Sequence, residues 1–331
     1  MEKKLAKLLF ISAYNSTYVK TDLSILEKSF KVRTLIISNW KKNLGKISEI
    51  YKGVLWADIS YIWFADFVAL LVIFFSKLLK KKTVVVIAGY ELTKIPEFKY
   101  GGQLTLISRM KIKYVLKNAD RILTVSDFSK NEIGKFVDLR KVRMIHLGEG
   151  LDCEDVKNKK ENLVVTVGKA QRNPRNIMKL KGLDTFVKAA KQIPEAEFVI
   201  IGEYDNETYN YLREGSSNII FTGNLSKEQT LKWFRKAKVY CHLSYRESFG
   251  LALLEAMNCG CIPFVTSNGA LPEVVGDTGY YVRYGDVEDT VKAINKALKS
   301  KNNEQARERA EEMFPLQKRE EELNKIMKEI L

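Results

Sequence analysis

Two carboxylates separated by seven residues form the stretch of this chain that is best suited to chemistry. Glu247 and Glu255 enclose a Ser-Phe-Gly turn and a short apolar run. The apolar runs 237–243 and 261–265 on either side are typical of buried strands. The motif is therefore predicted to lie at the carboxyl end of a strand and to open a helix, which is where ligands bind in open α/β sheets.

The predicted helix start can hold an anion. Its free N–H groups and the positive end of its dipole suit a phosphate group. Gly250 would allow a ligand to come close to the backbone, because it has no side chain. Glu255 lies among Leu and Ala inside the predicted helix and needs polar partners there, which a ribose diol would supply.

The motif resembles the donor site of retaining glycosyltransferases with the two-domain GT-B fold. These form glycosyltransferase family four, the group 1 enzymes that include glycogen synthases and mannosyltransferases. In that family the first Glu contacts the donor sugar, the second binds the nucleotide ribose, and turn amides between them hold the diphosphate. By position the resemblance assigns these roles to Glu247, to Glu255, and to Ser248, Phe249, Gly250 and Leu251. The alternative is a solvated Glu247 and a capping Glu255.

A second anion site is predicted where the apolar run 164–167 ends in Gly168 and Lys169. A polar insert over 170–180 leads to Lys181 and Gly182, which open a helix. The resemblance implies that Lys169 and Lys181 meet the diphosphate. Lys169 replaces the usual Arg and lacks its fork geometry. Because the insert is long, other cations remain alternatives to Lys169: Arg172, Arg175 and Lys179.

Further strand ends carry turn residues at the same predicted edge, namely Gly202, Gly223 and Asn224. The resemblance implies that the nucleotide base lies near them. The run 266–276 is similar to the family's turn after the donor helix. Ordinary tight-turn chemistry is the alternative for all of these.

The N-terminal half matches the family less closely. Residues 13–20 replace a glycine-rich loop, with Ser16 or Thr17 as a helix N-cap. Many relatives carry a His after the fourth strand, near the donor sugar, but the stretch 86–92 has none. Tyr90 or Glu91 falls near that place, and we expect Glu91 to orient an acceptor hydroxyl or contact the sugar. A carboxylate solvated in a loop is the alternative.

Positive charge is concentrated in one half of this chain of 331 residues and net charge +15. Residues 1–150 hold 27 Lys and Arg against 13 Asp and Glu, whereas residues 151–331 hold 28 against 27. A basic half attracts nucleic acid or an anionic membrane surface. With no recognised nucleic-acid motif, we expect a membrane surface and a glycan or lipid-linked acceptor. A Lys-rich composition without a partner is the alternative.

Other features exclude several classes of protein. The longest apolar run, 67–79, covers about 20 Å as a helix, short of the roughly 30 Å of a bilayer core. No signal peptide is expected. The four cysteines indicate free thiols in a reducing compartment, and His146 and His242 are too far apart in sequence to support a metal site. We therefore expect a cytoplasmic protein, peripheral on the inner membrane face, with no metal and no cofactor besides the donor.

Strand and helix patterns alternate along the chain, which predicts an α/β fold with doubly wound parallel sheets. Predicted strands cover 8–13, 32–37, 58–63, 83–88, 121–125, 142–146, 163–167, 197–201, 218–222, 239–243 and 262–265. Predicted helices cover 21–30, 67–79, 104–118, 127–136, 182–193, 209–214, 227–236, 251–257, 287–298 and a last helix from Pro315.

The polar stretch 152–162 is the best candidate for a linker. The resemblance implies two Rossmann-like domains facing across a cleft: an acceptor-side domain over 1–150 and a donor-binding domain over 151–312. It also implies that the terminal helix, 313–331, returns to the first domain, with Leu323, Ile326, Met327, Ile330 and Leu331 on one face.

We therefore predict a retaining, metal-independent glycosyltransferase that moves a sugar from a nucleoside diphosphate sugar to an acceptor hydroxyl. Retention and metal independence come from the resemblance. A nucleotide-sugar epimerase of GT-B architecture, a nucleic-acid-binding protein and a catalytically silent sugar-nucleotide-binding protein remain alternatives.

Overall fold

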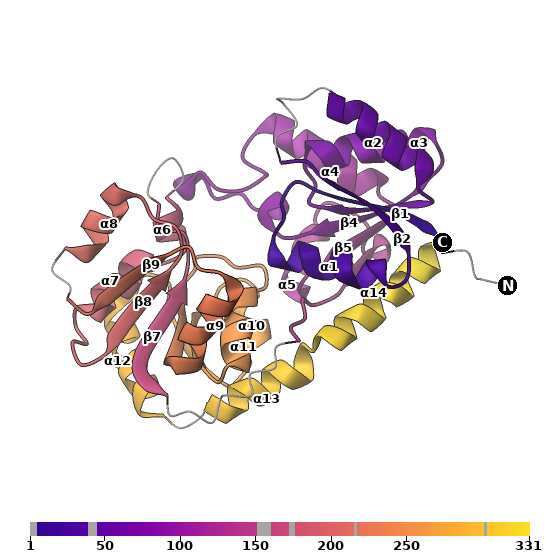
Figure 1. The fold of residues 1–331 in the computed structure, drawn as a ribbon. Helices are drawn as coiled ribbons and strands as arrows, with labels where there is room; N and C mark the ends of the chain where they lie inside the picture. Colours follow the sequence, from indigo (N-terminus) through magenta and orange to yellow (C-terminus); the bar gives the residue numbers. More distant parts are fainter. Residues whose placement is uncertain (1–4, 39–44, 151–159, 172–175, 215–216, 301–302) are drawn as a thin grey trace. The chain divides into compact units, whose positions relative to one another are not determined.

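The computed structural model describes residues 5–38, 45–150, 160–171, 176–214, 217–300 and 303–331. The chain divides into two compact units, each built on a six-stranded parallel sheet with flanking helices (Figure 1). Unit 1 comprises residues 1–96, 100–147 and 316–331, and unit 2 comprises residues 97–99 and 148–315. The predicted α/β class with parallel sheets is confirmed.

The sheet of unit 1 has the strand order β2-β1-β3-β4-β5-β6, with every pair parallel. Its strands are β1 Lys7–Ser12, β2 Lys31–Ile36, β3 Ile59–Trp63, β4 Lys82–Ile87, β5 Arg121–Thr124 and β6 Val142–Met144. Its helices are α1 Thr17–Glu27, α2 Gly45–Trp56, α3 Phe67–Leu78, α4 Leu106–Asn118, α5 Asp127–Ile133 and α14 Leu316–Ile330. The central strands are buried on both faces, which explains their continuous apolar runs.

The terminal helix α14 is fastened to unit 1 by a buried polar network. The Arg319 guanidinium donates to both carboxylate oxygens of Asp22 at 2.7 and 2.8 Å, and Tyr61 donates to Asp22 at 2.6 Å. The guanidinium also donates to the carbonyls of Ile145 and His146. Each nitrogen of the guanidinium therefore has an acceptor, which a buried cation needs.

The sheet of unit 2 has the strand order β12-β11-β10-β7-β8-β9, again parallel. Its strands are β7 Glu161–Val167, β8 Glu197–Ile201, β9 Ile219–Gly223, β10 Ala237–His242, β11 Ile262–Thr266 and β12 Tyr280–Val282. Its helices are α6 Ile177–Leu180, α7 Leu183–Ala190, α8 Asn206–Arg213, α9 Lys227–Lys236, α10 Leu251–Asn258, α11 Leu271–Val275, α12 Val287–Lys299 and α13 Asn303–Met313.

The strand order of unit 2 reverses beside β7. From β7 the chain moves outward to β8 and β9 on one side, and then returns to place β10 on the other side. Loops that leave β7 and β10 at their carboxyl ends therefore diverge from neighbouring strands, which opens a crevice in folds of this kind. The Glu247–Glu255 motif follows β10 and Lys169 follows β7, so both predicted anion sites lie at this point.

Several elements differ from the sequence predictions. Helix α2 was not predicted, because Gly45 and Gly53 weaken its pattern. Gly53 packs closely on the sheet, since an added Cβ would lie 3.0 Å from the Leu9 side chain, which would have to shift. The edge strand β12 has three residues, too few to give a strand pattern. The insert 170–180 contains the short helix α6.

The ends of the chain's helices show smaller differences. Helix α1 begins at Thr17, with Ser16 at the N-cap position, four residues before its predicted start. On α14 the side chains of Leu323, Ile326 and Met327 are buried, but Leu331 is 54% exposed, so its predicted place on the packed face is wrong.

Other sequence predictions concern the thiols and the longest apolar run. The side chains of Cys241, Cys259 and Cys261 are buried, and Cys153 lies outside the described residues. The apolar run 67–79 forms α3 and packs on the sheet. Across the described ranges, no helix combines the length and the hydropathy needed to cross a bilayer.

Candidate functional site

The loops that leave β7 and β10 are joined by their backbones. The Tyr245 amide donates to the Leu180 carbonyl at 2.8 Å. Gly182, which caps the start of α7, has a φ of +67°, and an added Cβ would lie 2.2 Å from the Leu243 carbonyl oxygen. Only glycine fits this contact. The close approach places Lys181, on the β7 side, beside the residues that follow β10.

Lys181 and Glu247, both predicted site residues, form an ion pair. Lys181 Nζ lies 2.8 Å from Glu247 Oε2. The same carboxylate oxygen lies 3.0 Å from Nε2 of His242, the last residue of β10. The other oxygen, Oε1, accepts from the Ser248 amide at 3.2 Å. The Glu247 carboxylate is therefore held by three groups in a fixed orientation.

These contacts determine whether the side chains of Glu247 and His242 are charged. Burial opposes ionisation of Glu247, but the Lys181 charge and the His242 hydrogen bond outweigh it and hold the pKa of Glu247 well below its usual range. Burial lowers the pKa of His242, despite the neighbouring Glu247. At neutral pH the imidazole is therefore neutral and the carboxylate ionised, so His242 Nε2 keeps its proton and donates a hydrogen bond to Glu247.

The motif continues into the start of α10 as the sequence predicts. Gly250 caps the helix with a φ of +96°. Gly269, in the loop after β11, packs on Glu247, because an added Cβ would lie 2.1 Å from the Glu247 carbonyl oxygen. Ala270 donates to that carbonyl at 2.9 Å. The Leu251 and Ala252 amides precede the first hydrogen bond of the helix, which Leu253 donates to the Gly250 carbonyl at 3.0 Å, and these two amides provide donors for an anion.

The turn residues between the two glutamates act through their backbone. The Phe249 ring is buried and packs edge-on against Phe314, with ring centroids 5.5 Å apart. Its side chain is therefore part of the core. Ser248 and Leu251 are half-buried at the turn.

Glu255 is buried on α10 beside a cation and a second carboxylate. Lys227 Nζ lies 3.6 Å from Glu255 Oε1 and 3.0 Å from Glu149 Oε2. Burial, with the neighbouring Glu149 carboxylate, raises the pKa of Glu255 to about 7 against the lowering effect of Lys227. Glu255 is thus neither solvated nor a helix cap. It is a polar group whose charge changes near neutral pH.

Lys169 and the residues expected near the base lie at the other side of the same edge. Lys169 Nζ pairs with Glu203 Oε2 at 2.7 Å, and both side chains are about half exposed. Gly202, with a φ of +146°, packs on the Gly168 carbonyl and donates to the Gly223 carbonyl at 3.0 Å. The next residue, Asn224, is exposed. Of the alternatives to Lys169, Arg172 and Arg175 lie outside the described residues, and Lys179 lies in α6.

Glu91 lies in unit 1 and differs from the solvated loop carboxylate considered above. Its side chain is 3% exposed and accepts from the Gly89 amide at 3.0 Å and the Ala65 amide at 3.4 Å. Burial raises the pKa of Glu91, against the lowering effect of these amides. The neighbouring Tyr90 is 37% exposed.

Sequence reasoning missed three polar residues of this site: His242, Lys227 and Glu149. His242 ends a strand, and Lys227 and Glu149 lie in stretches without a motif. The available signal was the position of His242, five residues before Glu247 at a predicted strand end. No group of three or more His, Cys, Asp or Glu side chains within the described ranges is arranged to hold a metal ion.

The family model for glycosyl transferases group 1 matches residues 154–313, which contain the site residues described for unit 2 apart from Glu149. Residues 154–313 form a group 1 glycosyltransferase domain. The O-antigen chain mannosyltransferase B of Escherichia coli is 27% identical over 193 residues, which cover 52% of this chain and 50% of that protein. The chain aligns with about half the length of the first curated relatives it matches.

Solved structures share the fold over nearly the whole chain. Sucrose-phosphate synthase from Thermosynechococcus elongatus superposes with a TM-score of 0.79 at 17% identity, covering 98% of each chain. Alr3699/HepE from Anabaena, in complex with UDP and glucose, gives a TM-score of 0.78 at 14% identity, covering 98% of this chain and 100% of that one. The glycosyltransferase domain is thus the second half of a GT-B fold, with unit 1 as the other Rossmann-like half.

Proposed function

We propose that this protein transfers a sugar from a nucleoside diphosphate sugar to an acceptor hydroxyl, with retention at the anomeric carbon and without a divalent metal. The observation that carries the proposal is the contact between Lys181 and Glu247 at the strand-order reversal, beside the start of α10. It brings a cation, a carboxylate and free helix amides together at the edge where α/β folds bind ligands.

In the proposed complex the diphosphate lies against Lys181 and the first amides of α10. Bond cleavage leaves negative charge on the diphosphate, and fixed positive groups stabilise that charge without reorganisation. Lys181 now pairs with Glu247, so the diphosphate would draw the ammonium toward itself and free one carboxylate oxygen. Glu247 would then accept hydrogen bonds from hydroxyls of the sugar, while His242 keeps the carboxylate oriented.

We assign the ribose to Glu255. An ionised carboxylate accepts two hydroxyl hydrogen bonds, and a diol supplies both. The nearby Lys227 favours the ionised form. Lys169 serves as a secondary contact to the diphosphate, and the turns at Gly202, Gly223 and Asn224 as the surroundings of the base. The UDP held by the structurally similar Alr3699/HepE supports a uridine or related nucleotide.

The acceptor is proposed to be a glycan, carried on a lipid or free, and unit 1 is proposed to attach to an anionic inner membrane face. The relative named for an O-antigen chain supports a glycan acceptor. The basic N-terminal half supports the membrane face. Glu91 shapes the loop that presents Tyr90, because its carboxylate is tied to backbone amides. A direct contact of Glu91 with sugar or acceptor remains part of the proposal.

A thermal-shift screen tests the proposal first, using UDP, GDP, ADP and their sugar conjugates with and without EDTA. A ligand at 100 times its Kd should stabilise the protein by about 2.7 kcal/mol. We expect one nucleotide to be preferred, and the same shift in EDTA. If no nucleotide raises the melting temperature of the folded protein, the proposed donor site is wrong.

Product analysis then separates the classes of activity. Incubation with the preferred sugar nucleotide and an acceptor should give a glycoside of retained configuration, detected by NMR. A changed sugar nucleotide in the absence of acceptor would indicate an epimerase, and binding without turnover would indicate a silent binding protein.

A further inference from the structure

Three neighbouring helices of unit 1, α2, α3 and α4, expose an unusual amount of apolar surface. They lie side by side along one face of the sheet (Figure 1). Their inner sides fill the core. Their outer sides carry eight large hydrophobic side chains that are more than one third exposed: Tyr51, Leu55, Phe74, Leu78, Leu106, Ile107, Met110 and Tyr114. Helices α1 and α14 expose no large hydrophobic side chain in the described residues.

Helix α4 has two apolar faces. Ile112, Val115 and Leu116 point into the core. Leu106, Ile107 and Met110 lie on the outer side and are 64%, 83% and 63% exposed. Large apolar groups that gather on one exposed surface mark an interaction site, because single scattered residues would not repeat at helical spacing.

The same surface is strongly basic. Segments 45–56, 67–82 and 106–118 carry ten Lys or Arg and a single acidic residue, Glu49. Glu49 already pairs with Lys46 at 2.7 Å. On α4 the cations Arg109, Lys113 and Lys117 recur every fourth residue beside the exposed apolar row. Apolar and cationic side chains therefore alternate across one helical face.

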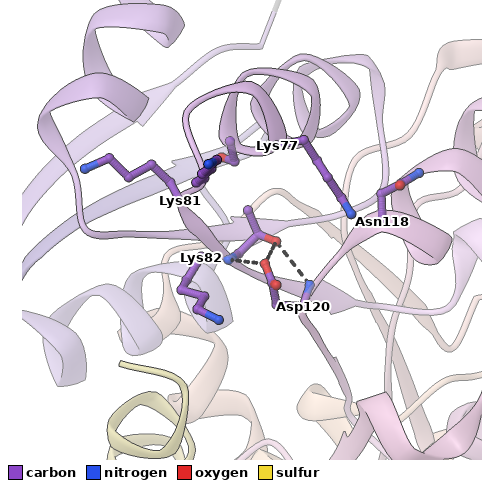
Figure 2. A pocket seen from close by; sticks show the side chains of 8 residues that line it. Lys77, Lys81, Lys82, Asn118 and Asp120 are labelled. Carbon is purple, nitrogen blue, oxygen red and sulfur yellow. Dashed lines mark hydrogen bonds between the residues drawn. The ribbon is translucent and has the colours of Figure 1, made fainter.

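The basic cluster at the end of α3 is not neutralised by its neighbours. Lys77, Lys80, Lys81 and Lys82 line a hollow of about 160 Å³ together with Asn118 and Asp120 (Figure 2). The Asp120 carboxylate accepts from the Thr83 amide at 2.9 Å and from the Thr83 hydroxyl at 2.8 Å. Within the described part of the chain no carboxylate lies within ion-pair distance of these four lysines.

A second hollow, of about 420 Å³, lies at the start of α4. Three apolar side chains and three cations share it: Leu106, Met110, Phe136, Arg109, Lys113 and Lys135. A phospholipid combines an anionic headgroup with apolar chains and matches such a lining. A free anion would leave the apolar half unused.

We infer that the outer face of α2, α3 and α4 binds the surface of an anionic lipid bilayer, with Leu106, Ile107 and Met110 entering the headgroup region. This inference deepens the membrane attachment proposed above and rests on it. Nucleic acid fits less well, because five of the eight exposed side chains, including the three most exposed on α4, are not aromatic and offer no stacking surface for bases. A second copy of the same face would bring like charges together.

Co-sedimentation with phosphatidylcholine vesicles, with and without 30% phosphatidylglycerol, tests the inference on the full chain. We expect binding only to the anionic vesicles, weakened by salt. The variant Arg109→Gln/Lys113→Gln/Lys117→Gln should bind about 100-fold more weakly, at about fivefold per charge. The variant Ile107→Ser/Met110→Ser should bind at least about tenfold more weakly, because two large side chains lose their burial in lipid.

Matched controls make the same kinds of substitution at exposed positions of unit 2. Lys188→Gln/Lys191→Gln/Lys292→Gln removes three charges, and Met313→Ser removes an apolar side chain that is 39% exposed. Both controls should bind anionic vesicles like the unchanged protein. The α4 changes are at exposed positions, and unchanged melting temperatures would show that they leave the fold intact.

Three results would overturn the inference: equal binding to both kinds of vesicle, α4 variants that bind like the controls, or binding of a short RNA duplex with none to vesicles. Nucleotide-induced thermal shifts on the same samples separate this inference from the proposed function. If vesicle binding is absent but a nucleotide still raises the melting temperature, only the proposed membrane surface is wrong. If no nucleotide raises the melting temperature, the proposed donor site is wrong.

Discussion

The ammonium of Lys181 lies 2.8 Å from the carboxylate of Glu247, although the two residues are 66 positions apart in the sequence. The pair joins the loop after β7 to the loop after β10, where the strand order of unit 2 reverses. In the function proposed above, this contact would hold the cation for the leaving diphosphate beside the acceptor for sugar hydroxyls before a donor binds.

Lys181→Ala should lower kcat by about 100-fold or more, while the donor Kd rises only several-fold. Charge on the leaving diphosphate grows in the transition state, so a fixed cation there acts more on turnover than on binding. Steady-state kinetics and calorimetry measure the two effects. Lys169→Ala is the matched control, because Lys169 is half exposed and paired with Glu203. Its effects should stay below about fivefold. Equal losses of kcat and affinity in Lys181→Ala would indicate simple binding.

His242→Leu should lower kcat/KM by about ten- to 100-fold, because the Glu247 carboxylate loses a hydrogen bond of about 1.5–3 kcal/mol that fixes its orientation. His242→Gln can donate from a similar position and should recover part of the loss. Melting temperatures report whether either variant unfolds. If folded His242→Leu has an unchanged kcat/KM, the imidazole does not orient Glu247 for the reaction.

Glu255→Ala should weaken nucleotide binding by about 1.5–3 kcal/mol, since a carboxylate loses its hydrogen bonds to the ribose. The pKa of Glu255, raised to about 7, adds a pH dependence. The ionised form is the better acceptor, so affinity should rise several-fold between pH 6 and 8. Calorimetric titrations across this range measure the effect, and Glu255→Gln should bind weakly with no such rise. A pH-independent affinity in the unchanged protein would contradict the assignment.

The raised pKa of Glu255 also predicts the sign of a stability effect. The folded state holds the proton more tightly than the unfolded chain, whose Glu pKa is about 4.5. The stabilising contribution of the protonated group is therefore complete below about pH 4.5 and is lost as pH rises through about 7. Glu255→Gln should raise the free energy of unfolding at pH 8, by up to about 3 kcal/mol, and leave it nearly unchanged at about pH 4, below the unfolded pKa. Urea unfolding at both pH values checks this.

Arg319→Ala should lower the free energy of unfolding by about 3–5 kcal/mol. The change leaves Asp22 buried without its bidentate partner and frees the carbonyls of Ile145 and His146. Denaturant unfolding measures the loss. Glu320→Ala, which breaks the exposed pair with Lys28 on the same helix, is the control and should cost less than about 1 kcal/mol. Similar losses in both variants would show that the buried network carries no special stability.

Local patterns in the sequence predicted most of the strands and helices. Helix α9 begins and ends as predicted, and β8 does too, because an apolar period or a buried run is visible within a few residues. Helix α2 and strand β12 were not predicted, because they depend on contacts with distant residues. Gly53 of α2 packs against Leu9, and β12 pairs with β11. Neither contact leaves a local pattern.

The site residues also fall into those predicted from local spacing and those brought together only by the fold. The sequence by itself determined that Glu247, Gly250 and Glu255 surround a helix start after a strand, because their spacing is local. Only the tertiary structure brought His242 and Lys181 onto the Glu247 carboxylate, and Glu149 and Lys227 beside Glu255. Contacts between distant segments depend on strand order, and ionisation depends on burial and on neighbouring charges. No short stretch of sequence contains either kind of information.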